Sequence, residues 1–242
     1  MSLWRSDRFL LGIGADGFAL TRAAQADTAV LAQPLRAADW PGLGAQLATV
    51  ARGAVTVTVA DEIARYLVLT LPAALESLGD ARLWLATRFE QIYGESPADW
   101  RIEADWQPGR PVLVCALPNV LLQGLQPLVV QSIAPAFLRI WNRYCHRLPA
   151  SGLWCLFDAG MLRIAYWQDG DFVLYRQLRM NEPLAAAALR AVLEQEFARI
   201  DALPPQHCFW SGAAVPQGWT ELVLAPAALS GIQALAWQGV GR

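Results

Sequence analysis

Residues 153–178 constrain the fold most, because three strands follow one another there with no helix between them. Leu153–Phe157 is an almost unbroken apolar run, which is typical of a strand buried on both faces. Leu162–Trp167 alternates with a period of two, which indicates a second strand. Asp169–Gly170 favours a hairpin turn, since both residues tolerate positive φ. Phe172–Leu178 then returns as a third strand.

The N-terminal region repeats this pattern. Apolar strands are predicted at Phe9–Ile13, Phe18–Arg22 and Thr28–Gln33, with a turn at Gly14–Gly17 between the first two. The two meanders begin roughly 145 residues apart, and each precedes a helical stretch. The repeat predicts an α/β protein with two βββαβα lobes and a cleft between them. We expect lobes at 1–150 and 151–242, the second one shortened.

The middle of the chain predicts an α+β subdomain inserted into the first lobe at about 55–117. Its expected elements are the paired strands Val55–Val59 and Tyr66–Leu71, a helix at Ala81–Tyr93, and the strand pair Trp100–Trp106 and Val112–Ala116. Further helices are expected at Val120–Val130 and Pro135–Arg147, and a late helix carries the apolar stripe Leu189, Val192, Leu193, Phe197 and Ile200. A short strand follows at His207–Trp210.

Composition excludes several functional classes. The chain has 242 residues, is 55% hydrophobic and carries a formal net charge of −2, so no overall field favours nucleic acid. All of its basic residues other than the two histidines are arginines, which excludes Walker-type phosphate loops, Schiff-base chemistry and lysine general bases. The longest apolar region, residues 112–130, is interrupted by Pro118 and Pro127 and does not resemble a membrane span. We therefore expect a cytoplasmic protein without a secretory signal.

The cysteines and histidines do not predict a metal site. Cys115 and Cys155 lie in predicted buried strands, where a free cysteine is commonly a small core residue. The adjacent pairs at 145–146 and 207–208 each join a cysteine to a histidine. Neighbouring side chains diverge on a strand or a helix, so neither pair can easily aim both groups at one zinc ion. The same spacing gives no support to a cysteine nucleophile served by either histidine.

Two surface features have alternative interpretations. Arg139, Arg143 and Arg147 are spaced to form one stripe on a helix, which favours a solvated face; the alternative is a dock for an acidic partner. The chain has 11 tryptophans, and Trp84, Trp100 and Trp106 fall within the predicted insertion. Burial in a core is the commoner role for tryptophan, and a binding hot spot is the alternative.

The order of these segments resembles the PilM family of type IV pilus assembly proteins and, more distantly, the cytoplasmic domain of the type II secretion protein GspL. LLGIGADGFALTR resembles the first phosphate hairpin of that family, and LFDAGMLRIAYWQDGDFVLYRQL resembles the second. YLVLTLP, LWLATRFEQIYG and WRIEADW resemble its inserted subdomain, and CFWSGAA resembles the late loop that faces the nucleoside. The resemblance covers nearly the whole chain and implies an actin-like, ribonuclease H-like fold.

The resemblance implies a nucleotide cleft with eight contributing positions: Gly12, Gly14, Asp16, Gly17, Asp158, Gly160, Ser211 and Gly212. Three departures from the family pattern argue against a working nucleotide cleft. Gly14 stands where a catalytic aspartate is expected, bulky residues follow Gly160 in place of small hydroxyl residues, and the late loop has one glycine instead of two. One carboxylate is too few to organise a magnesium ion and an attacking water. We therefore expect no hydrolysis, no catalytic residue and no resident metal, while binding of ATP with magnesium stays an alternative.

The resemblance also implies a role. PilM-like proteins are cytoplasmic platforms that capture the cytoplasmic tail of a single-span inner-membrane protein, PilN in pilus systems, and so lie at the membrane through that partner. We expect the peptide groove between the first lobe and the inserted subdomain, around Val55–Ala116. Two alternatives are an active or nucleotide-gated ATPase or kinase of the same fold, and a binding module unconnected with pili.

Overall fold

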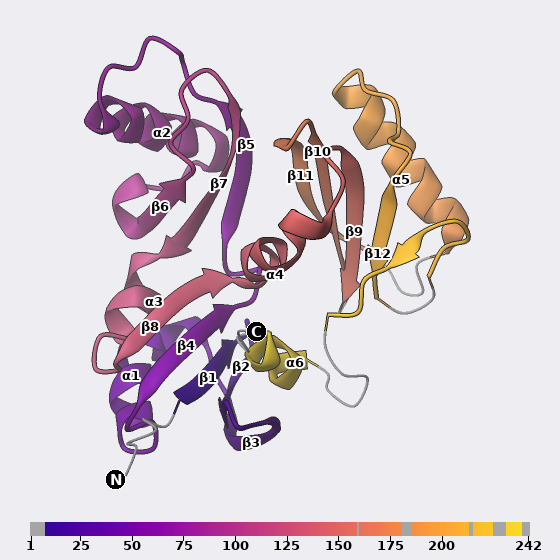
Figure 1. Ribbon diagram of the computed structural model, residues 1–242. Coiled ribbons are helices and arrows are strands. Elements are labelled where there is room, and N and C mark those ends of the chain that lie inside the picture. Colours follow the sequence, from indigo (N-terminus) through magenta and orange to yellow (C-terminus); the bar gives the residue numbers. More distant parts are fainter. Residues whose placement is uncertain (1–7, 159, 181–184, 213–214, 225–230, 239–242) are drawn as a thin grey trace, which may run out of the picture.

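The computed structural model of the chain describes residues 8–158, 160–180, 185–212, 215–224 and 231–238. Two lobes and an inserted subdomain are visible in Figure 1. The sheet of the first lobe has the order β3-β2-β1-β4-β8, and that of the second lobe has the order β11-β10-β9-β12-β13. The inserted subdomain has its own three-stranded sheet, β5-β7-β6.

The two larger sheets have the same topology. In each, the three strands of a meander pair antiparallel, and the first of them pairs in parallel with a fourth strand that pairs in parallel with a fifth. The first sheet contains β1 (Arg8–Ile13), β2 (Gly17–Arg22), β3 (Gln25–Pro34), β4 (Ala54–Val59) and β8 (Val130–Pro135). The second contains β9 (Gly152–Asp158), β10 (Met161–Gln168), β11 (Asp171–Arg179), β12 (Cys208–Ser211) and β13 (Thr220–Glu221). The predicted duplication of the lobes is confirmed.

The inserted subdomain packs one long helix on one face of its sheet. Its elements are β5 (Arg65–Thr70), α2 (Leu78–Tyr93), the 3-10 turn η2 (Pro97–Asp99), β6 (Trp100–Ala104) and β7 (Pro111–Pro118). Ser77 begins α2 by accepting a hydrogen bond from Asp80 N, and Gly94 ends it in the left-handed conformation. Leu85 and Phe89 of α2 pack on Val114 of β7.

Two predictions about this region are wrong. Val55–Val59 does not pair with Tyr66–Leu71, because β4 lies between β1 and β8 in the first sheet while β5 pairs with β7. The three-stranded sheet of the insertion therefore begins at Arg65. The helix expected at Val120–Val130 is confined to α3 (Asn119–Gly124), and Val130 begins β8.

The remaining helices cover the two large sheets. The 3-10 turn η1 (Ala37–Asp39) leads into α1 (Trp40–Ala48), which packs beside α3, and α5 (Ala186–Arg199) covers the outer face of the second sheet. The helix predicted at Pro135–Arg147 is observed as α4 (Ala136–Tyr144) followed by the 3-10 turn η3 (Cys145–Arg147).

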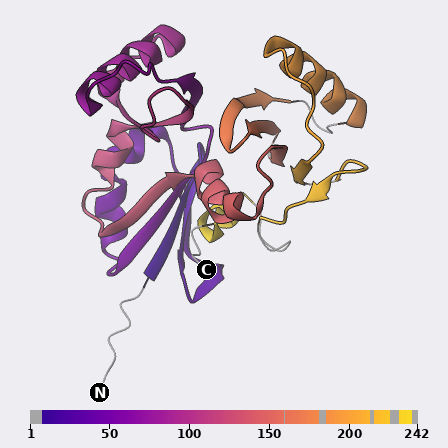
Figure 2. The same ribbon diagram turned by 45° about the horizontal axis from the view of Figure 1, so that its top comes forward.

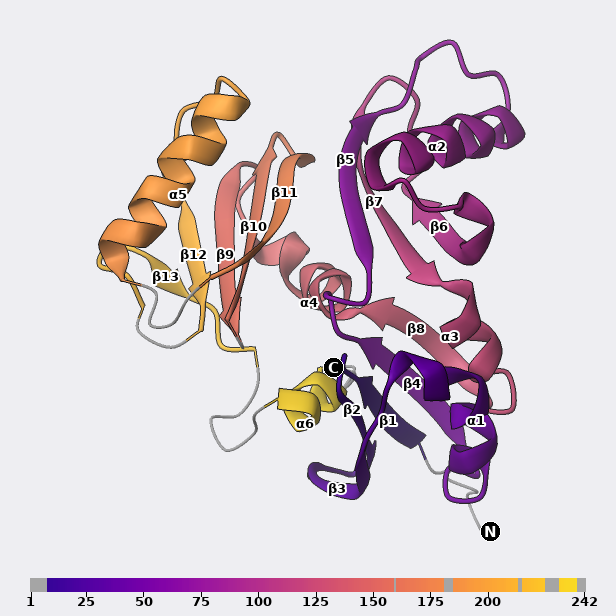
Figure 3. The same ribbon diagram turned by 180° about the vertical axis from the view of Figure 1, so that it is seen from behind.

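The last helix of each lobe packs against the other lobe. Phe137 of α4 contacts the rings of Trp154, Phe172 and Tyr175 in the second lobe. In the opposite direction, α6 (Gly231–Trp237) follows the strands of the second lobe and lies on β1 and β2 of the first, as Figure 3 shows. Figure 2 shows α4 between the two lobes. One apolar core consequently extends through both of them.

None of the helices in the described part of the chain is both long enough and apolar enough to cross a lipid bilayer.

Candidate functional site

A cleft of about 390 Å³ lies between the two lobes. The first lobe contributes Gly14 and Asp16 from the turn between β1 and β2, and the second contributes Asp158 at the end of β9. The structure thus brings together three of the eight residues that the sequence assigned to a nucleotide cleft. The other five are not among the described residues that line this cavity.

Helix α6 occupies the space in front of two predicted glycines. A Cβ atom at Gly12 would lie 2.6 Å from Ala236 N and from Ile232 O, which are backbone atoms of α6. A Cβ atom at Gly17 would lie 2.7 Å from Ile232 Cδ1 and 2.9 Å from Gln33 O. The missing side chains therefore leave room for the backbone of α6 at Gly12 and for the side chain of Ile232 at Gly17.

The three other predicted residues have structural contacts of their own. Gly160 adopts a φ of +72°, which favours glycine, in the turn between β9 and β10. The Ser211 hydroxyl donates to Leu222 O at 2.7 Å and accepts from Trp154 Nε1 at 3.0 Å, so both of its hydrogen-bonding roles are filled inside the protein. A Cβ atom at Gly212 would lie 2.6 Å from Phe157 O. These contacts join β12 to β9 and β13, and we assign them to packing.

A carboxylate from the chain itself lies at the turn between β1 and β2. Ala15 N donates to Glu62 Oε1 at 3.3 Å, and Glu62 belongs to the loop that follows β4. A backbone N–H in such a turn is the kind of donor that could bind a phosphate oxygen. Here it already has an anionic partner.

The neighbouring Asp61 is almost completely buried and forms an ion pair across the cleft. Arg163 Nε of β10 lies 2.8 Å from Asp61 Oδ2, and the two side chains are 8% and 1% exposed. Burial alone would lower the pKa of Arg163, but the Asp61 carboxylate and more distant acidic groups outweigh it and raise that pKa. Asp61 Oδ1 also accepts hydrogen bonds from Tyr66 Oη at 2.7 Å and from Phe137 N at 2.9 Å.

The charges of the cleft are mostly negative. Its lining contains the acidic residues Asp16, Asp61, Glu62 and Asp158 and the basic residue Arg163. No group of three or more acidic, histidine or cysteine side chains in the described residues is arranged to hold a metal ion.

A second candidate site is a groove on the face of the inserted sheet that α2 leaves uncovered. Two cavities of about 500 Å³ each share Glu103, Cys115 and Leu138 in their linings. They therefore adjoin along the sheet, and the two together are called the groove below. Leu113 and Leu117, spaced two residues from Cys115 along β7, complete the apolar floor.

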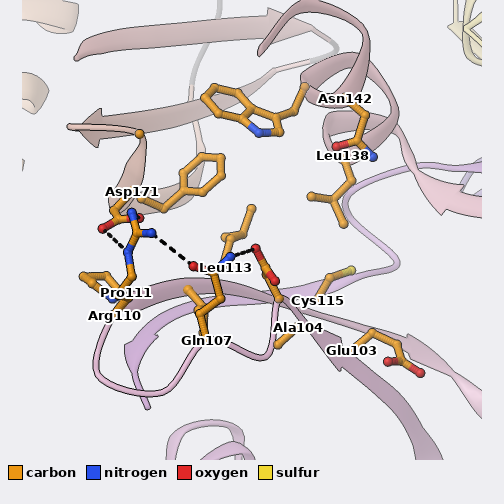
Figure 4. A pocket seen from close by; sticks show the side chains of 15 residues that line it. Glu103, Ala104, Gln107, Arg110, Pro111, Leu113, Cys115, Leu138, Asn142 and Asp171 are labelled. Atoms are coloured by element: carbon orange, nitrogen blue, oxygen red, sulfur yellow. Dashed lines mark hydrogen bonds and ion pairs between the residues drawn. The ribbon is translucent and has the colours of Figure 1, made fainter. Parts of the chain in front are cut away.

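The groove connects all three parts of the molecule. One end lies between β6 and β8, where Arg101 and Ile133 line it. The other end reaches the turn between β10 and β11, where Arg110 Nη2 and Nε lie 2.6 Å and 3.1 Å from the two oxygens of Asp171. Figure 4 shows this end, with Leu138 and Asn142 of α4 on the wall opposite Arg110. A groove was expected beside the inserted subdomain, but its walls come from residues 101–142 and 170–172 and not from β4.

Two of the three arginines in the predicted stripe have partners inside the protein, so the stripe as a whole is not a solvated face. Arg139 Nη2 donates to Val57 O at 2.8 Å, and burial, followed by the nearby charge of Arg143, lowers the pKa of Arg139. Arg143 Nη2 donates to Gln238 O, and its guanidinium lies 5.7 Å from the ring of Trp237. Both arginines therefore link α4 to its neighbours, while Arg147 is exposed.

Solved structures share this architecture over nearly the whole chain. The cytoplasmic domain of EpsL, an inner-membrane component of the type II secretion system of Vibrio cholerae, superimposes with a TM-score of 0.58 at 12% identity, covering 96% of this chain and 94% of that one. A Bacteroides thetaiotaomicron protein with an actin-like ATPase fold and unknown function gives a TM-score of 0.56 at 9% identity, covering 98% of both chains. The fold is actin-like.

A third structure with this actin-like fold comes from the PilM–PilN type IV pilus biogenesis complex. It gives a TM-score of 0.52 at 15% identity, covering 86% of this chain and 82% of that one. No protein-family model matches the chain, and no curated protein matches it significantly in sequence. The likeness confirms the fold that the order of segments predicted.

Sequence reasoning missed Glu62 and the pairing of Asp61 with Arg163. Two adjacent acidic residues that directly follow the apolar strand Val55–Val59 were the available signal, because an aspartate at the end of a buried strand requires a partner. The identity of that partner depends on how two lobes meet, which no local pattern contains.

Proposed function

We propose that this chain is a cytoplasmic scaffold of a type IV pilus or related secretion system that binds the cytoplasmic tail of an inner-membrane protein. The groove across the inserted subdomain carries the proposal. Similarity in fold to a chain of the PilM–PilN type IV pilus biogenesis complex and to the cytoplasmic domain of EpsL supports the choice of system.

The shape of the groove suits an extended peptide. Its two cavities have about 1000 Å³ in total, from 500 Å³ each, and this space is elongated along β7. Leu113, Leu117 and Leu138 provide apolar contacts, whereas Arg101 and Glu103 provide polar ones at the rim. β6 and β8 are edge strands of their sheets, and edge strands can pair with an added peptide strand.

The cleft between the lobes fits a magnesium nucleotide poorly, and we therefore propose that the scaffold does not hydrolyse ATP. Ala15 N already donates to Glu62, and Ile232 covers the backbone of the first hairpin. Arg163, which could have bound a phosphate, is paired with Asp61. A triphosphate would have to displace these contacts and enter a cavity with more acidic than basic groups.

Peptide binding tests the proposal directly. Synthetic peptides would correspond to the cytoplasmic segments of single-span membrane proteins encoded beside this chain, and fluorescence anisotropy would measure their affinity. We expect one peptide to bind, and Leu138→Glu to weaken its binding at least about tenfold, since a charge would enter the apolar wall of the groove. Leu83→Glu is the matched control, because Leu83 is 71% exposed on α2 and should leave the affinity unchanged. If no peptide binds, or both variants behave alike, the groove is not the site.

The alternative is a nucleotide-gated ATPase or kinase, which the presence of Asp16 and Asp158 in one cleft favours. It predicts that ATP with magnesium raises the melting temperature and that Asp158→Ala abolishes the increase. A ligand at 100 times its dissociation constant would add about 2.7 kcal/mol of stability, which a melting curve detects easily. We expect no change in wild type or variant; a magnesium-dependent increase would favour the alternative.

A further inference from the structure

The Asp61 carboxylate lies where the three parts of the molecule meet. Tyr66, which donates to it, lies in β5 of the inserted sheet. Phe137, whose N–H also donates, lies in the first turn of α4, and Arg163 belongs to the second lobe. Gln177 Nε2 of β11 donates to Asp61 O at 3.2 Å, which adds a second link to the second lobe.

The partners of Asp61 are next to the walls of the groove. Phe137 precedes Leu138 in α4, so a shift of the helix at its N-terminus would move that wall. Tyr66 lies opposite Cys115 in the antiparallel pairing of β5 with β7, and Cys115 is the part of the floor that both cavities share. The ring of Tyr66 also contacts that of Tyr175 in β11, with centroids 4.4 Å apart.

We propose that Asp61 and Arg163 are positioning residues of the groove: their buried ion pair fixes α4, the inserted sheet and the second lobe relative to one another, and this arrangement sets the width of the groove. Each carboxylate oxygen has a defined role. Oδ1 binds within the first lobe and its insertion, and Oδ2 binds across the cleft. The pair therefore holds the two lobes in a fixed relative position without a ligand bound between them.

The inference rests on the proposed function only in taking the groove as the binding site. The positioning itself concerns the free protein, so it can be measured without any peptide. The Cys115 thiol is a probe already present in the floor, and it is 6% exposed. The thiol of Cys155, 0% exposed in the second lobe, serves as an internal reference for global unfolding.

The experiment measures the rate at which N-ethylmaleimide labels each cysteine, resolved by mass spectrometry, in wild type and in Arg163→Met. Loss of the ion pair should let the groove open locally, and we expect the rate at Cys115 to rise about tenfold while that at Cys155 changes less than about twofold. Burial, and then the charge of Asp61, raise the pKa of Cys115. Removal of Arg163 leaves that negative charge unpaired, which would slow labelling; a faster rate therefore reports access.

Two further variants keep the test decisive. Arg176→Met removes an arginine from β11 whose ion pair with Glu196 stays within the second lobe, and it should leave the Cys115 rate unchanged. If Arg163→Met does not fold, Arg163→Gln retains a hydrogen-bond donor beside Asp61 and should give an intermediate rate. An unchanged Cys115 rate, or equal increases at Cys115 and Cys155, would overturn the positioning role. Loss of peptide binding in Leu138→Glu would still support the proposed function in that case.

Discussion

Gly12 shows how a single residue can serve packing where a ligand was expected. Its Cα lies so close to α6 that a methyl group would meet two backbone atoms of that helix. Backbone atoms cannot rotate away as the end of a side chain can, so α6 would have to move. The smallest substitution at this position therefore tests how firmly the helix is held.

We expect Gly12→Ala to lower the free energy of unfolding by about 1 to 3 kcal/mol, because the added Cβ would overpack the contact with Ala236 and Ile232. Urea denaturation measures the change. Gly42→Ala is the control: nothing lies within 4 Å of a Cβ at that position in α1, and alanine should stabilise the helix by up to about 1 kcal/mol. Equal effects in the two variants would mean that α6 moves away from the added Cβ atom without lowering the free energy of unfolding.

Buried tyrosines make the stability depend on alkaline pH. Burial first, and then the charge of Asp61, raise the pKa of Tyr66 and of Tyr175 well above the ordinary value of 10.0. The folded protein keeps these protons where the unfolded chain has lost them, so their contribution is complete below pH 10 and falls as the pH rises above it. Each tyrosine should remove about 1.4 kcal/mol per pH unit in that range.

Urea denaturation between about pH 8 and about pH 11 checks this expectation, and Tyr175→Phe should reduce the slope against pH by about 1.4 kcal/mol per unit. An unchanged slope in this variant would show that the Tyr175 phenol ionises equally in both states.

Among the elements, α4 joins both lobes and the insertion through one aromatic ring. The ring of Phe137 is 2% exposed and contacts four rings outside α4, of which Tyr66 belongs to the insertion and Trp154, Phe172 and Tyr175 belong to the second lobe. We expect Phe137→Ala to cost about 3 to 5 kcal/mol, measured by urea denaturation. A cost below about 1 kcal/mol would show that the interface closes around the missing ring.

The success of sequence reasoning also differed from element to element. The meanders were predictable because successive residues of a strand face different layers: Ile164 packs toward α5, whereas Ala165 packs toward the first lobe. The apolar run after Asn119 has no such alternation between two faces. Its helix stops at Gly124, and Val130 pairs with Val55 of β4 as a strand. Whether such a segment forms a helix or a strand depends on partners that are distant in sequence. The contacts of Asp61 depend on distant partners in the same way.

At the scale of the molecule, the exchange of α4 and α6 makes the lobes depend on each other. We expect residues 1–150, expressed alone, to aggregate or to bind a dye for exposed apolar surface, because α6 no longer covers β1. Co-expression with residues 151–242 should restore a soluble complex that unfolds in one transition. A soluble, cooperatively folded fragment 1–150 would contradict this dependence.

The position of α6 also has a consequence for synthesis. β1 ends at Ile13 and α6 begins at Gly231, so 218 positions of chain, 231 minus 13, separate two elements that touch. A ribosome adding about 5 to 20 residues per second needs roughly 10 to 45 s to cover that distance. Until α6 emerges, the strands of the nascent first lobe have an apolar face that nothing covers, so we expect a chaperone at the ribosome exit to bind there.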